Sequence, residues 1–125
     1  YKRSTNGGRR RGLKSPAGGA WEKLSDGTYK YHFAEGLEAT DYWLEIDGTW
    51  YYFGHDNIMQ TGWVKDDGNW YYMDLKTGAL FTGWHEISGK WYYFHEEGDG
   101  FKGTLMVNCE TPDGYTVDVN GALVE

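Results

Sequence analysis

The sequence predicts an all-β protein, a solenoid of stacked β-hairpins. A tryptophan-led segment recurs, and its leading residues Trp43, Trp63 and Trp84 follow one another after 20 and then 21 residues. The inner tryptophans Trp50 and Trp70 precede the inner tryptophan of the next copy by the same numbers of residues. A fixed period of this length is typical of repeat arrays, in which each unit buries its apolar face only against its neighbours.

Two turns divide each unit. Asp47-Gly48, Asp67-Gly68 and Ser88-Gly89 each lie between two short aromatic or aliphatic runs, which is typical of a tight hairpin, because glycine accepts the positive φ that such turns require. The second turn is expected at Asn57, Gly78, Gly100 and Gly121. Asparagine tolerates the left-handed conformation better than most residues. We therefore expect a hairpin, a loop and the next hairpin, without any long helix.

The chain begins with a basic, glycine-rich segment. Residues 1–20 hold six lysine and arginine residues and no acidic residue. The glycines and Pro16 indicate a linker or tail. The arginine cluster leaves one alternative open, a contact with nucleic acid or an acidic polymer.

About five hairpin units are expected after this segment. Residues 21–42 form a degenerate first unit, in which Tyr29 takes the place of the inner tryptophan. Residues 43–62, 63–83 and 84–104 are near-complete copies, and residues 105–125 form a degenerate cap with Leu105 in place of the leading tryptophan. Atypical end units are what a stacked array needs as caps.

Aromatic side chains replace the usual aliphatic core. The 125 residues include 18% aromatic residues and 19 glycines, and the mean hydropathy is −0.75. Residues 21–125 hold six basic and 19 acidic residues. This repeat region is suited to cationic ligands and poorly suited to nucleic acid.

Nothing in the sequence indicates catalysis, a metal or a cofactor. The four histidines lack the spacing of metal ligands, and the pairs Asp66-Asp67 and Glu96-Glu97 fall at turns or loops, where solvated charges are expected. The single Cys109 excludes an internal disulfide bond. No apolar run is long enough to cross a membrane.

The repeat resembles the choline-binding, or cell-wall-binding, repeat of Gram-positive surface proteins and phage lysins. The resemblance follows Trp43 to Phe53 and its copies from Trp63 and Trp84, with a loop that closes on Thr-Gly before the next tryptophan. It covers residues 43–104 closely and 21–42 and 105–125 loosely. It implies a left-handed superhelix of hairpins, a secreted, wall-associated protein without catalytic activity of its own, and a homodimer through a terminal hairpin as one option.

The resemblance also implies aromatic cages that bind choline groups of teichoic acids between consecutive hairpins. The first cage draws on Trp43, Trp50, Met59 and Trp63 with Tyr72. The second draws on Trp63, Trp70, Leu80 and Trp84 with Tyr93, and Trp91 belongs to the next copy. Because Leu105 replaces a tryptophan there, a third cage is expected to be incomplete or absent, so two good sites are expected. Trp21, Tyr29, Tyr31 and Tyr42 offer a marginal cage with Trp43.

The chemistry of such a cage is independent of the family. A quaternary ammonium donates no hydrogen bond, so it is bound by the negative faces of aromatic rings, at about 0.5–2 kcal/mol per ring. Three rings give a dissociation constant on the order of millimolar. Two other functions remain open: a glucan- or carbohydrate-binding module of an extracellular enzyme, and a purely structural array whose grooves stay empty.

Overall fold

The computed structural model describes residues 12–14, 19–33, 38–39, 42–96 and 102–124. Its regular elements are all strands, so the expected all-β hairpin fold is confirmed. The strands are β1 (Gly12–Lys14), β2 (Ala20–Lys23), β3 (Tyr29–His32), β4 (Tyr42–Ile46), β5 (Thr49–Phe53), β6 (Gly62–Asp66), β7 (Asn69–Met73), β8 (Gly83–Ile87), β9 (Lys90–Phe94), β10 (Cys109–Glu110) and β11 (Thr116–Val117). No helix in this part of the chain is long and apolar enough to cross a membrane.

Consecutive strands pair as antiparallel hairpins, β2 with β3 and so on to β10 with β11. The predicted turns are confirmed. Asp47 and Gly48 have φ of 52° and 83°, and Ser88 and Gly89 have φ of 53° and 84°. Two successive positive φ values give the turn that matches the right-handed twist of a hairpin. The second turn is confirmed at Asn57, Gly78 and Gly121, whereas Gly100 lies outside the described residues.

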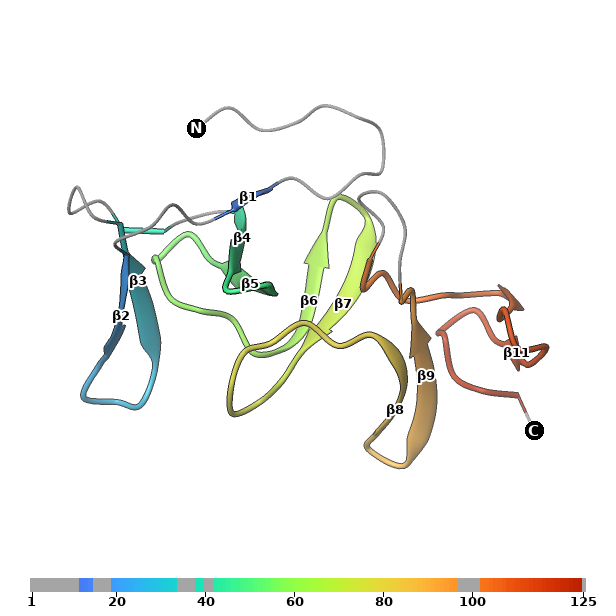
Figure 1. Cartoon of the computed structure of the whole chain (residues 1–125). Helices are drawn as coiled ribbons and strands as arrows, with labels where there is room; N and C mark the ends of the chain where they lie inside the picture. The colour runs from blue at the N-terminus through green and yellow to red at the C-terminus, as the bar shows by residue number, and fades with distance from the viewer. Residues whose placement is uncertain (1–11, 15–18, 34–37, 40–41, 97–101, 125) are drawn as a thin grey trace.

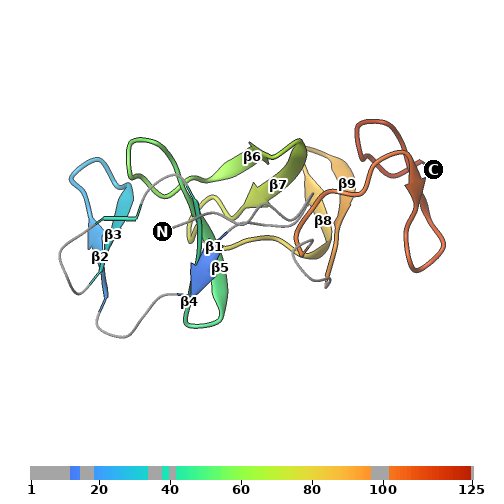
Figure 2. The same ribbon diagram turned by 90° about the horizontal axis from the view of Figure 1, so that it is seen from above.

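The hairpins follow one another along one axis and project in different directions from it (Figure 1). In that view the turns of β2–β3 and β8–β9 point downward, whereas the turn of β6–β7 points upward. The turn of β4–β5 projects in a further direction, which Figure 2 shows from above. The molecule is therefore a row of rotated hairpins, in which each inner hairpin lies between two neighbours.

Backbone hydrogen bonds between the units fix the stacking. After each hairpin the chain folds back, and one N–H donates to a carbonyl on the second strand of the preceding hairpin. The four donor and acceptor pairs are Met59 to Tyr29 (2.9 Å), Leu80 to Trp50 (3.0 Å), Leu105 to Trp70 (2.8 Å) and Leu123 to Trp91 (2.8 Å). Because the bond is repeated, each unit packs on the preceding unit in the same way.

The core consists of small clusters at the junctions between hairpins. Trp43, Val64, Tyr71 and Met73 are buried together where β4–β5 meets β6–β7, and Tyr72, Ile87 and Phe94 form the next cluster. Aromatic residues supply most of the largest fully buried side chains. Stability therefore comes from contacts between neighbours, as the period predicted.

The last hairpin begins later than the sequence indicated. Leu105 forms an isolated bridge with Phe94, as Met59 does with Phe53 and Leu80 with Met73. Leu105 therefore lies in the return loop of the preceding hairpin and does not occupy the position of a leading tryptophan. Cys109 pairs with Val117 as Gly83 pairs with Phe94, so Glu110 stands where Trp84 stands one unit earlier. The long segment after Phe94 concealed this shift.

Part of the predicted N-terminal tail forms a strand. Residues 12–14 pair in parallel with β4, with Gly12 opposite Trp43, and this makes a three-stranded sheet β1-β4-β5. The rest of the predicted linker, including the Arg9-Arg10-Arg11 cluster, lies outside the described residues.

Candidate functional site

One contact recurs at every junction between hairpins. The leading tryptophan of each hairpin packs against the central tyrosine of the following hairpin. The four ring pairs, with their centroid distances, are Trp21 with Tyr51 (4.9 Å), Trp43 with Tyr71 (4.6 Å), Trp63 with Tyr92 (5.1 Å) and Trp84 with Tyr115 (5.8 Å).

Strand geometry explains the contact. Successive side chains of a strand point to opposite faces, and directly paired residues share a face. Trp63 pairs with Tyr72, and Lys65 pairs with Trp70. These residues therefore share the face of the β6–β7 hairpin that points toward the following hairpin, which we call the forward face. Tyr71 lies on the backward face, toward the preceding hairpin. Each junction thus joins a tryptophan-rich face to a face that carries the central tyrosine.

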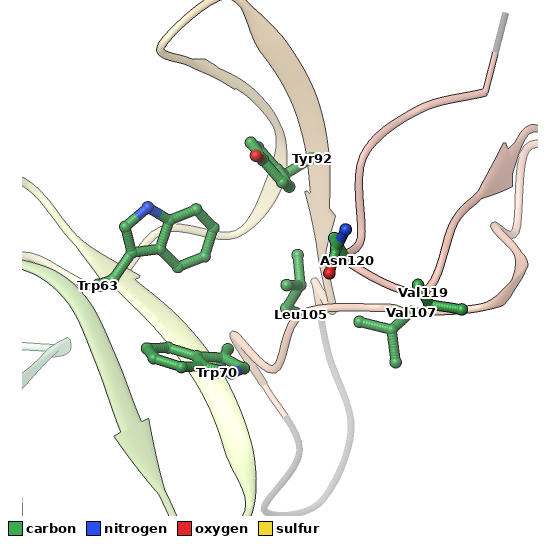
Figure 3. A pocket seen from close by; sticks show the side chains of 7 residues that line it. All are labelled: Trp63, Trp70, Tyr92, Leu105, Val107, Val119 and Asn120. Carbon is green, nitrogen blue, oxygen red and sulfur yellow. The ribbon is translucent and has the colours of Figure 1, made fainter.

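The junction after β6–β7 is an open pocket (Figure 3). Its aromatic walls are Trp63, Trp70 and Tyr92, and Leu105 lies between them. The rings of Trp63 and Trp70 are perpendicular, with centroids 6.1 Å apart. Val107, Val119 and Asn120 extend the pocket toward the last hairpin. None of these lining residues carries a charge. We call this the Trp63 pocket.

A second open pocket lies at the next junction. It is lined by Trp84, Trp91, Asp113, Tyr115 and Leu123. Trp91 is 42% exposed, the same fraction as Trp70 in the Trp63 pocket, so both inner tryptophans offer ring surface to a ligand. We call this the Trp84 pocket. The sequence predicted an incomplete cage here, whereas the structure supplies the third ring from Tyr115.

Asp113 gives the Trp84 pocket a fixed carboxylate. The Trp84 indole N–H donates to its Oδ2 (2.8 Å), and the Thr111 hydroxyl donates to its Oδ1 (2.5 Å). These two bonds, the threonine bond first, lower the pKa of Asp113 below its ordinary value of 3.8. The carboxyl group is therefore ionised at neutral pH.

The earlier junctions differ in their access. Trp43 is 0% exposed, and its indole N–H donates to Asp66 (2.9 Å). Trp50 and Leu80 pack against the same cluster. A fully buried ring offers no face to a ligand, so this junction belongs to the core in the structure described here.

Trp21, at the first junction, contacts Tyr29, Tyr31, Tyr51 and Phe53. Burial raises the pKa of Tyr51. The side chain of Tyr42, which the sequence placed in a marginal cage here, lies outside the described residues.

The predicted cage residues are therefore grouped differently. Tyr72 and Tyr93 lie across their own hairpins from Trp63 and Trp84, with ring centroids 5.1 Å apart in both cases, instead of closing the preceding cage. Met59 reaches the first junction through its bond to Tyr29. Leu80 likewise lies one junction earlier than predicted, beside Trp43 and Trp50.

Several wall residues were not predicted from the sequence. The structure adds Tyr92 and Leu105 to the Trp63 pocket, and Asp113, Tyr115 and Leu123 to the Trp84 pocket. The alternation of strand faces was the available signal for the tyrosines. The described residues contain no group of three or more histidine, cysteine, aspartate or glutamate side chains placed to hold a metal ion.

Comparison with known proteins gives a family match. A family model described as a choline-binding repeat matches residues 39–82 and 81–115. No curated protein sequence matches the chain.

Solved structures of pneumococcal and phage proteins are similar to it. Choline binding protein F from Streptococcus pneumoniae, in the presence of a peptidoglycan analogue, is 36% identical over 84% of this chain and 33% of its own, with a TM-score of 0.73. The choline binding domain of Spr1274 from the same organism is 38% identical over 66% of this chain and 93% of its own, with a TM-score of 0.57.

A multimodular cell wall endolysin from phage Cp-1, complexed with choline, is 34% identical over 84% of this chain and 30% of its own, with a TM-score of 0.56. The chain thus spans about a third of the length of choline binding protein F and of this endolysin.

Proposed function

Because the chain belongs to the choline-binding repeat family, we propose that it is a non-catalytic cell-wall attachment module that binds choline groups of teichoic acids. The observation that carries the proposal is the recurrence of one wall set in both open pockets. Each pocket combines two tryptophans of one hairpin, a tyrosine of the next and a leucine of the return loop. This arrangement suits a trimethylammonium group, which is recognised by ring faces and by shape.

The site residues proposed are those of the two open pockets. They are Trp63, Trp70, Tyr92 and Leu105 in the first, and Trp84, Trp91, Tyr115 and Leu123 in the second. Trp43 and Trp50 contribute to the stack instead. Three rings in each pocket support binding of about 3–5 kcal/mol, which corresponds to a dissociation constant on the order of millimolar.

The proposed place of action is the outside of a cell whose wall polymers carry choline. The relatives support this proposal, since one is a cell wall endolysin complexed with choline and another was solved with a peptidoglycan analogue. A lytic or adhesive domain elsewhere in a longer protein would supply activity of its own. A homodimer through a terminal hairpin stays a prediction.

A choline titration followed by tryptophan fluorescence and calorimetry tests the function. Saturable binding of two choline molecules is expected, with no binding of a glucan oligosaccharide. Trp70→Ala and Trp91→Ala each reduce the stoichiometry from two to one. Leu75→Ala removes an exposed apolar side chain outside both pockets and leaves the stoichiometry unchanged.

The outcomes separate the functions that the sequence left open. No response to choline at about 100 mM, which fills a millimolar site almost completely, would remove the proposal. A response to the glucan alone would indicate a carbohydrate-binding module, and no response to either ligand would indicate a structural array.

A further inference from the structure

The two open pockets have walls made of the same types of residue, but they differ in the charges around them. Among the residues that the structure describes, those lining the Trp63 pocket are uncharged, whereas those lining the Trp84 pocket include Asp113. A carboxylate in a shallow, partly apolar pocket attracts a cation and does nothing comparable for a neutral ligand of the same shape. The difference between the pockets is therefore a difference in specificity.

The Asp113 carboxylate is held in place before any ligand arrives. Its two oxygens accept hydrogen bonds from Trp84 and Thr111. Thr111 is itself 3% exposed, and its hydroxyl oxygen accepts the backbone N–H of Tyr115 (3.1 Å). A carboxylate has about four acceptor positions, so these two bonds leave it free to interact with a ligand. No lysine or arginine is found among the described residues that line this pocket.

The residues opposite the inner tryptophans carry charges of opposite sign. Glu86 lies directly opposite Trp91 on the neighbouring strand, and Lys65 lies directly opposite Trp70. The Lys65 ammonium is 5.8 Å from the centroid of the Trp70 ring. A cation already placed over this ring weakens its attraction for a second one, whereas Glu86 adds negative potential beside Trp91.

We propose that the two pockets select differently: the Trp84 pocket selects ligands that carry a positive charge, through Asp113, whereas the Trp63 pocket selects by shape and also accepts neutral ligands. This inference rests on the proposed function, because it assigns a specificity to each choline pocket. Asp113 is its specificity-determining residue.

The test compares choline with 3,3-dimethylbutan-1-ol, a neutral ligand of the same shape. Trp70→Ala leaves only the Trp84 pocket, and Trp91→Ala leaves only the Trp63 pocket. The preference is the dissociation constant of the neutral ligand divided by that of choline. We expect a preference about fivefold greater in Trp70→Ala than in Trp91→Ala.

Asp113→Asn then removes the charge and keeps an oxygen for the Trp84 N–H. In the Trp70→Ala background it lowers the preference for choline about fivefold, and in the Trp91→Ala background it has no effect. Asp26→Asn is the matched control. Asp26 also accepts a hydroxyl bond from a threonine, Thr28 (2.6 Å), but it lines neither pocket.

The dependence on salt provides a measurement that needs no substitution at Asp113. Choline binding to the Trp84 pocket weakens as salt rises from 0.01 to about 1 M, and choline binding to the Trp63 pocket does not, because salt screens an exposed charge pair. Equal preferences and equal salt dependence in the two pockets overturn this inference while choline binding itself persists. Absence of choline binding to the unmodified chain overturns the proposed function and this inference together.

Discussion

Glycine is required at position 121 because the side chain of Leu105 packs directly against it. A Cβ atom added at Gly121 would lie 2.7 Å from Leu105 Cδ2, and the residue has a φ of 86°. The same approach recurs one unit earlier, where a Cβ atom on Gly103 would lie 2.6 Å from Leu80 Cδ1. Leu80 and Leu105 thus each pack against a glycine of the following loop.

Gly121→Ala is expected to destabilise the fold by ~2–3 kcal/mol, from the left-handed φ and the clash together. It should also weaken choline binding at the Trp63 pocket, because the displaced Leu105 lines that pocket. Thermal melting and a choline titration measure the two effects.

Gly89→Ala isolates the backbone contribution. Gly89 has a similar φ of 84°, but a Cβ atom there would meet nothing within 4 Å. This variant should lose only ~1–2 kcal/mol and bind choline normally. Equal melting temperatures for the two alanine variants would show that contact with Leu105 has no effect.

A site residue could be predicted from the sequence when it recurs with the repeat, and not when its role depends on contacts between hairpins. Trp63, Trp70, Trp84 and Trp91 were identified because they recur at a fixed spacing. The choice between adjacent tyrosines was not settled by spacing, since it depends on which face of a hairpin meets its neighbour. Asp113 accepts the indole N–H of a leading tryptophan, as Asp66 does at an earlier junction. Spacing did not predict this contact, because it joins side chains of two different hairpins.

At the level of the hairpin, the residue types of the turn alone determined the conformation of the turn. Dipeptides such as Asp47-Gly48 and Asp67-Gly68 adopt the expected positive φ values, because this turn conformation is a local property. The boundary of the last unit was missed for the opposite reason. Its position depends on the Phe94–Leu105 bridge, which forms across a loop of variable length.

The loop between β7 and β8 is held by one carboxylate. Asp74 accepts the backbone N–H groups of Thr77 (2.9 Å) and Lys76 (2.8 Å), and these bonds, Thr77 first, lower its pKa below 3.8. A lowered pKa in the folded state contributes stability that is present above the unfolded value of about 3.9 and is lost as the pH falls through the folded value.

The unmodified chain should therefore melt at a higher temperature than Asp74→Asn at pH 7, and the difference should shrink below about pH 4. Melting curves of both proteins between pH 7 and pH 2 measure it. A difference that stays constant over this range would contradict the role of the ionised carboxylate.

The whole molecule presents the two open pockets at consecutive junctions. A polymer with repeated choline groups can occupy both, so the second binding event takes place at a high effective concentration. We expect a polymer with several phosphocholine groups to bind tenfold or more tightly than free choline. The comparison requires both ligands at the same ionic strength.

Trp70→Ala or Trp91→Ala should each remove this advantage, because one remaining pocket binds the polymer no better than free choline. Surface plasmon resonance on the immobilised polymer provides the measurement. A single-pocket variant that keeps the full polymer affinity would show that the two pockets do not act together.

The return-loop bond from Leu105 to Trp70 and its counterparts place every pocket across a boundary between units. A row of hairpins therefore has at least one more hairpin than pockets. The last hairpin contributes residues to the pocket that it forms with the preceding hairpin, but its own forward face forms no pocket. Duplication of a single unit of about twenty residues in the gene would add one pocket without redesign of the others. Loss of the final unit would remove a pocket whose tryptophans all lie upstream of the deletion.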